Sequence, residues 1–209
     1  MSNLFENISD KNILKLKRIL RSSTIKYPKN VNILSNVNHS DSIGVMDYGK
    51  VQLVYTDYEG NKIVLEELNE GDIIGTLNSS IYLEEITGMT KEETQITFIE
   101  YNQITNDDII KYDFYIIFIK NLIRILTEQL KSRNTRIELL TKKSTRDKLL
   151  AYFKLQSQVK KNNTYTLPMS YTEISYYLSV DRSAMTREIK YLTEEGFIKK
   201  DNKQITINY

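Results

Sequence analysis

Residues 180–192, VDRSAMTREIKYL, combine arginines, small hydroxyls and a lysine with a regular apolar spacing. Met185, Ile189 and Leu192 fall on one side of a helix with 3.6 residues per turn. An arginine can donate two parallel hydrogen bonds to guanine O6 and N7, and small hydroxyls fit close to bases or phosphates. An ordinary solvated face is the alternative interpretation. We favour a helix that reads the major groove of DNA through a polar face made of Ser183, Thr186, Arg187 and Lys190, flanked in the first turn by Arg182.

The residues that precede this segment predict a second, shorter helix joined to it by a tight turn. Ser170 and Glu173 form a capping box, in which each side chain bonds the backbone N–H of the other residue. Ser179-Val180 makes the turn, and Asp181 is a good N-cap because its side chain accepts free N–H groups of the next first turn. The pattern is that of a helix–turn–helix.

The flanking residues complete a winged helix. TRDKLLAYFKLQSQ predicts a helix before the pair and TYTLP a short strand. Gly196 stops the second helix, and FIKKDNKQITINY predicts a hairpin around Asp201-Asn202. Lys199 and Lys200 lie on this hairpin, where we expect them to contact phosphates.

Charge is distributed unevenly along the 209 residues. Residues 141–209 hold 13 basic and 7 acidic side chains, a net charge of +6, whereas residues 1–140 hold 16 basic and 20 acidic ones, a net of −4. A basic end on a near-neutral chain is the asymmetry expected of a part that binds nucleic acid.

The composition excludes several classes of function. The chain has no cysteine, which rules out disulfides, thiolate metal sites and iron–sulfur clusters. With one histidine, no phosphate loop and no paired metal motif, an enzyme is the least favoured class, and no metal or cofactor is expected. The N-terminus lacks a signal peptide and no run approaches the roughly 18 apolar residues of a membrane span, so a cytoplasmic protein without a membrane partner is expected.

Residues 25–110 have the sequence pattern of a β domain. Short runs rich in Val, Ile and Tyr recur at intervals of about 8–12 residues, which is typical of an all-β barrel or sandwich. Gly49, Gly60 and Gly71 fall between the runs at turn positions.

A long helix is predicted from the next segment, because residues 107–140 contain neither glycine nor proline. Apolar residues recur there at alternating steps of three and four, which makes a heptad seam that Arg133 interrupts once. A helix lying on the core of its own domain is the alternative. We favour a homodimer, whose interface would comprise Ile116, Ile119, Ile123, Leu126, Leu130 and Ile137, with Leu140 continuing the seam.

These patterns together resemble the family of the cyclic-AMP receptor protein and the fumarate and nitrate reduction regulator, the Crp/Fnr family. The likeness spans nearly the whole chain: YGKVQLVYTDYEGNKIVLEELNEGDIIG is similar to the family's β-roll, and LTEEGFIKKDNKQITI follows the helix–turn–helix. The resemblance implies an α+β fold, with a β-roll sensor (a cupin-like jelly roll) over residues 1–109, a dimerisation helix over 110–140 and a winged helix–turn–helix over 141–209. It also implies a homodimeric bacterial transcription regulator on palindromic double-stranded DNA, with RNA polymerase as a further candidate partner.

Residue by residue, Arg187 stands at the family's guanine-reading arginine, and Arg182 where relatives carry another base- or phosphate-contacting arginine. Ser183 replaces the usual glutamate, which leaves the preferred half-site open. The sensor departs further. Thr76 replaces the ribose-binding glutamate, and no arginine for a cyclic phosphate occurs between Arg21 and Arg124.

We therefore expect no response to cyclic nucleotides. The sole histidine, His39, lies in a polar loop sequence and is not expected to bind haem. The remaining pocket would suit an apolar ligand or be a filled core, which we favour; its predicted lining is Ile73, Ile74, Thr76, Leu77 and Tyr82. A second reading of the whole chain is an effector-independent protein-interaction or ligand-binding module whose winged helix docks on protein rather than DNA.

Overall fold

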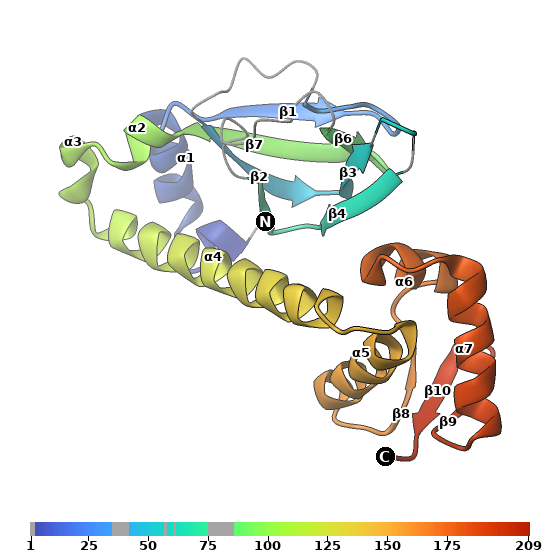
Figure 1. Cartoon of the computed structure of the whole chain (residues 1–209). Helices are drawn as coiled ribbons and strands as arrows, with labels where there is room; N and C mark the ends of the chain where they lie inside the picture. The colour runs from blue at the N-terminus through green and yellow to red at the C-terminus, as the bar shows by residue number, and fades with distance from the viewer. Residues whose placement is uncertain (1–2, 35–41, 57, 61, 75–85) are drawn as a thin grey trace. The chain divides into compact units, whose positions relative to one another are not determined.

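The computed structural model describes residues 3–34, 42–56, 58–60, 62–74 and 86–209 (Figure 1). The chain divides into two compact units, unit 1 over Met1–Leu130 and unit 2 over Lys131–Tyr209. The division falls inside the long helix α4, Asp113–Leu140. No helix in the described ranges is both long enough and apolar enough to cross a membrane.

Unit 1 contains the predicted β region. Its described strands form antiparallel sheets in the orders β1-β7-β2-β5 and β4-β3-β6. The strands are β1 Ser23–Tyr27, β2 Ser42–Tyr48, β3 Val51–Thr56, β4 Lys62–Leu68, β5 Ile73–Ile74, β6 Ile86–Thr90 and β7 Thr94–Glu100. The predicted turns at Gly49, Gly60 and Gly71 all have positive φ, which glycine adopts at little cost. At Gly49 a Cβ would lie 2.5 Å from Thr94 Oγ1, so the β2–β3 turn requires glycine for space as well.

Helices cover one end of these sheets. The chain begins with η1 Asn3–Phe5 and α1 Asp10–Ile19, and continues after β7 with α2 Tyr101–Ile104 and α3 Asp107–Ile110 before α4. The predicted long helix thus starts at Asp113, after a break at residues 111–112. One face of α4, with Phe114, Phe118, Leu122 and Ile125, is buried in the main core of unit 1 together with residues of η1 and α1.

Polar side chains fix α4 on this core. The buried Asn121 amide donates to the carbonyl oxygens of Leu4 and Glu6, at 3.1 and 2.8 Å, and Arg124 pairs with the Glu6 carboxylate. Further along, the buried Gln129 side chain accepts from the backbone N–H of Ile73 and donates to its carbonyl oxygen. The helix is therefore held on β5 as well as on the N-terminal segment.

Unit 2 has the predicted order of elements. They are α5 Thr145–Lys160, β8 Thr164–Thr166, α6 Tyr171–Leu178, α7 Arg182–Glu194, β9 Ile198–Asp201 and β10 Gln204–Ile207. The three strands form a sheet in the order β8-β10-β9. The core of unit 2 contains Met185, Ile189 and Leu192, which the sequence assigns to the inner face of α7, together with Ile174 and Leu178 of α6. The periodicity prediction for α7 is confirmed.

Candidate nucleic-acid interface

The start of α7 is fixed by the capping residues that the sequence predicts. At α6 both bonds of the capping box are present: the Glu173 N–H donates to Ser170 Oγ, and the Ser170 N–H donates to the Glu173 carboxylate. The turn passes through Ser179, whose φ is 49°. Asp181 then accepts from the backbone N–H of Ala184 at 2.8 Å. Hydrogen bonds from the Ser183 hydroxyl and from this N–H lower the pKa of Asp181, so the cap is charged at neutral pH.

α7 has two different faces. Met185 and Leu192 are fully buried and Ile189 nearly so, which anchors the helix to the core. The opposite face is exposed along the length of the helix. It carries Ser183, Thr186, Arg187 and Lys190, and Arg182 flanks it in the first turn; all five residues that the sequence assigns to this helix are exposed.

The hydroxyl protons on this face are already in use. Ser183 donates to Asp181 Oδ1 at 2.5 Å, and Thr186 donates to the carbonyl oxygen of Arg182 at 2.8 Å. In this arrangement each hydroxyl presents acceptor lone pairs to a partner, while the arginines and Lys190 supply the donors. The sequence alone does not reveal which groups accept and which donate on this face, because that depends on the rotamers of Ser183 and Thr186.

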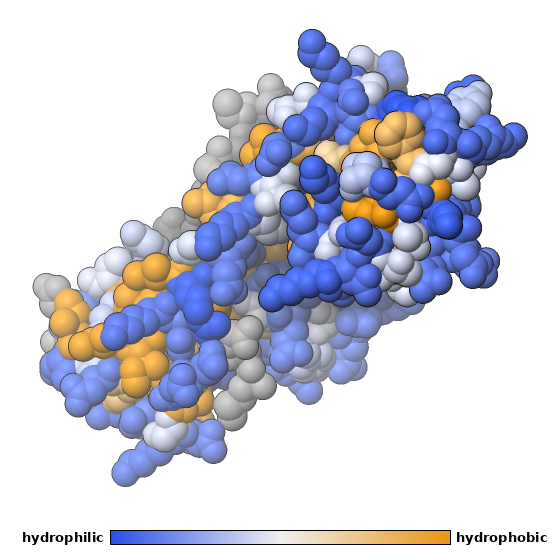
Figure 2. Space-filling model, turned by 90° about the horizontal axis from the view of Figure 1, so that it is seen from below, coloured by the Kyte–Doolittle hydropathy of each residue, from blue (hydrophilic) through white to orange (hydrophobic). Residues whose placement is uncertain are grey.

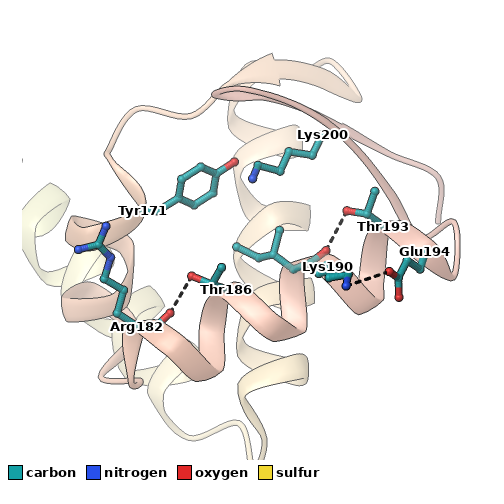
Figure 3. Close-up of a pocket in the computed structure, with 8 residues that line it drawn as sticks. Tyr171, Arg182, Thr186, Lys190, Thr193, Glu194 and Lys200 are labelled. Carbon is teal, nitrogen blue, oxygen red and sulfur yellow. Dashed lines mark hydrogen bonds and ion pairs between the residues drawn. The ribbon is translucent and has the colours of Figure 1, made fainter.

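A groove lies between α7 and strand β9, with a cavity volume of about 570 Å³ (Figure 3). The first turns of α6 close one side of it through Tyr171. The described residues that line the groove are Tyr171, Arg182, Thr186, Ile189, Lys190, Thr193, Glu194 and Lys200. Three of these carry a positive charge and one a negative charge, so the groove suits an anion.

Tyr171 connects α6 to the β9–β10 hairpin. Its hydroxyl donates to the carbonyl oxygen of Asn202 at 2.9 Å, and Lys200 Nζ lies 4.8 Å from the centre of its ring. Sequence reasoning missed Tyr171, Thr193 and Glu194. Tyr171 gives no local signal beyond its place in the capping box, since its partners lie about thirty residues away.

Lys199 and Lys200 belong to opposite faces of the hairpin. Lys200 pairs with Ile205 and lines the groove, whereas Lys199 pairs with Thr206. Successive residues of a strand point to opposite sides of the sheet. The sequence treats the two lysines as equivalent, but only Lys200 shares the groove with α7.

Arg146 of α5 supports the far end of α7. Its guanidinium pairs with Glu188 at 3.1 Å and with Glu195, and it lies over the ring of Phe197. The hydrogen bond from Arg146 lowers the pKa of Glu195. This arginine is therefore ion-paired within unit 2, although the sequence indicates only its contribution to the net charge of residues 141–209.

No protein-family model matches the sequence, and no curated protein matches it. Solved structures do match. CprK complexed with OCPA is 16% identical, with a TM-score of 0.70 over 92% of this chain and 88% of that one. A CooA mutant from Carboxydothermus hydrogenoformans is 18% identical, with a TM-score of 0.65 over 99% and 95%. A protein from Eubacterium rectale that is named as a member of the crp/fnr family is 18% identical, with a TM-score of 0.54 over 98% of this chain and 92% of that one.

The chain has the fold of the Crp/Fnr regulators. The coverage spans both units, so the resemblance noted in the sequence extends to the β-sheet domain and to the helical C-terminal part. At these identities the match concerns the fold, and the residues of each site have to be argued from this chain.

In this Crp/Fnr fold, α4 presents a second candidate surface. Ile116, Ile123, Leu126, Leu130 and Ile137 are exposed by 47% to 58%, and Ile119 is half-buried. All six lie on the predicted heptad seam, and Ile119 also packs against the core of unit 1. Figure 2 shows hydrophobic side chains gathered on the surface over α3 and the start of α4.

The predicted effector pocket is described only in part. Ile73 and Ile74 are buried, at 2% and 5% exposure, in two separate clusters of the unit 1 core. Thr76, Leu77 and Tyr82 lie outside the described residues, as does His39. Lys91 is exposed in the turn between β6 and β7.

Proposed function

We propose that the chain is a homodimeric, sequence-specific DNA-binding regulator of transcription that does not depend on a cyclic nucleotide. In this proposal residues 1–109 form a jelly-roll sensor domain, 110–140 the dimerisation helix and 141–209 a winged helix–turn–helix. The observation that carries the proposal is the exposed polar face of α7 beside a groove lined by Arg182, Lys190 and Lys200.

Reading of bases is assigned to the first half of α7. The N-terminal part of a recognition helix is the part that reaches base edges, and Arg187 is exposed in this half of α7. Its guanidinium can donate to both acceptors of a guanine, and the free lone pairs of Ser183 and Thr186 can accept from an amino group of cytosine or adenine. Lys190, Lys199 and Lys200 are assigned to phosphates, which position the helix without selecting a sequence.

Dimerisation is assigned to the exposed seam of α4. A row of large apolar side chains that are each about half exposed is unusual on a monomer and marks an interaction surface. A second copy of α4 is the occupant that fits, because the row repeats with the heptad spacing of a helix pair. Two copies of α7 would then face a palindrome, with half-sites about one turn of DNA apart.

Independence from cyclic nucleotides is supported by the distribution of cations in unit 1. A buried cyclic phosphate needs a paired cation or several oriented donors. Between Ile63 and Ile110 the sequence offers only Lys91, and its side chain is exposed in a turn. The described part of the pocket, at Ile73 and Ile74, is packed into the core.

The decisive experiment is to incubate the purified protein with sheared genomic DNA and to sequence the fragments that it retains. We expect a small set of enriched fragments that share an inverted repeat, and binding to them that weakens steeply as salt rises. Retention without a shared sequence, or no retention at low salt, would favour docking of α7 on a protein instead.

A further inference from the structure

The groove beside α7 contains a carboxylate as well as cations. Glu194 lines it together with Arg182, Lys190 and Lys200, and its Oε1 lies 3.6 Å from Lys190 Nζ (Figure 3). Both side chains are more than half exposed, at 73% for Lys190 and 57% for Glu194. An exposed pair of this kind is weak and exchanges readily for another partner.

Nothing in the geometry of α7 calls for a carboxylate at this position. Glu194 is the last residue of the helix, where the helix dipole disfavours negative charge. The order lysine then glutamate, four residues apart, is also the less favourable one for a helical pair. The neighbouring Glu195 differs, because Arg146 binds it together with Glu188 and so ties α7 to α5.

We propose that Glu194 competes with DNA phosphate for Lys190 and thereby limits binding to DNA of any sequence. The inference rests on the proposed function. Lys190 must exchange Glu194 for a phosphate when α7 approaches a duplex, and the carboxylate itself repels the same phosphate. Binding that depends on phosphates alone suffers fully from this competition.

The test is Glu194→Gln in the full chain, with a labelled duplex of random sequence of about 30 base pairs as the probe. In the wild type, the cation that Lys190 displaces from the duplex is offset by one that the freed Glu194 carboxylate takes up, so Glu194→Gln should steepen the slope of log affinity against log salt by roughly 0.9. At about 0.1 M salt we expect the affinity for the random duplex to rise roughly fivefold. Glutamine keeps the size of the side chain and suits a helix, so the fold should be retained.

The matched control is Glu138→Gln. Glu138 and Lys142 form another exposed pair four residues apart, at 3.7 Å, outside the groove. This variant makes the same change of net charge, and we expect no more than a small change of affinity. A second arm repeats Glu194→Gln in a Lys190→Gln background, where most of the gain should disappear.

The inference is overturned by an unchanged affinity in Glu194→Gln, by an equal gain in Glu138→Gln, or by a full gain without Lys190. A wild-type protein that binds no duplex at low salt would overturn the proposed function itself, and the two failures are therefore distinguishable.

Discussion

Helices α4 and α7 both bury one face, and they differ in what they leave outside. α7 exposes arginines, hydroxyls and a lysine, whereas α4 exposes a row of isoleucines and leucines. A polar face is satisfied by water alone, so its exposure says little until a groove with matching charge lies beside it. An exposed apolar row is costly in water and indicates a partner directly.

The same contrast separates the two kinds of partner. Covering a half-exposed leucine contributes about 1 kcal/mol, and electrostatic screening by salt does not weaken this gain. Contacts between cations and phosphates weaken with salt and are largely independent of sequence. We therefore expect the α4 surface to determine assembly, the cations of the α7 surface to give a salt-dependent affinity for DNA, and base contacts by Arg187 to select the sequence.

The largest effect should come from a charge on the α4 seam. Leu126→Lys or Leu130→Lys would bury two like charges per dimer, at a cost of roughly 3 kcal/mol or more. We expect light scattering to report a dimer for the wild type and a monomer for either variant. Glu128→Lys, at an exposed position of α4 off the seam, is the control and should remain dimeric. An unchanged dimer in the seam variants would break the comparison.

The next largest effect belongs to base reading on α7. Arg187→Ala should cost roughly 1–3 kcal/mol of site-specific binding and relax the preference at one guanine in each half-site. Competition between the enriched operator and a scrambled duplex measures it. Lys154→Ala, which removes an exposed cation of α5, should leave that discrimination intact. If Arg187→Ala keeps full discrimination, the exposed face of α7 is solvated rather than a reader.

The sequence predicts some features of these two helices and misses others. The buried face of α7 follows from residue spacing, and the caps at Ser170 and Asp181 follow from residue type, because both signals are local. The seam of α4 was predictable for the same reason. The face of α4 that is buried in unit 1 was not predicted. The break at Lys111-Tyr112 was not predicted either, since neither glycine nor proline marks it.

Long-range contacts explain what the sequence missed at the groove. Tyr171 is held at the groove by its hydrogen bond to the carbonyl oxygen of Asn202. Arg146 holds α7 by its ion pairs with Glu188 and Glu195. These partners are 31 to 49 residues apart, and no periodicity connects them. The pairing of Glu194 with Lys190 is local and could have been read from their spacing, but its place in the groove depends on the fold.

A smaller effect should separate two adjacent lysines. Lys200→Ala removes a cation from the groove and should reduce the salt slope by about 1. Lys199→Ala should change the slope less, because Lys199 belongs to the other face of the hairpin. Titrations of a random-sequence duplex at several salt concentrations measure both. Equal slopes for the two variants would mean that the groove side of the hairpin has no special part in binding DNA.

The smallest expected effect is that of cyclic AMP or cyclic GMP on the whole protein. The groove of unit 2 gathers three cations around a cavity, whereas the sequence from Ile63 to Ile110 contains one, Lys91, exposed in a turn. A cyclic phosphate entering the sensor would lose its hydration without an arginine to replace it. Ile73 and Ile74 are already buried, and Gln129 bonds both backbone groups of Ile73.

Calorimetry and thermal shift at millimolar nucleotide should therefore show no binding, and operator affinity should stay unchanged. The physical reason is the difference between the two units: the same phosphate chemistry has a cationic groove in unit 2, and in the described part of the unit 1 pocket it meets a packed apolar core. A micromolar heat of binding, or a nucleotide-dependent rise in operator affinity, would contradict this. Phosphate recognition would then belong to both units, and the contrast between them would fail.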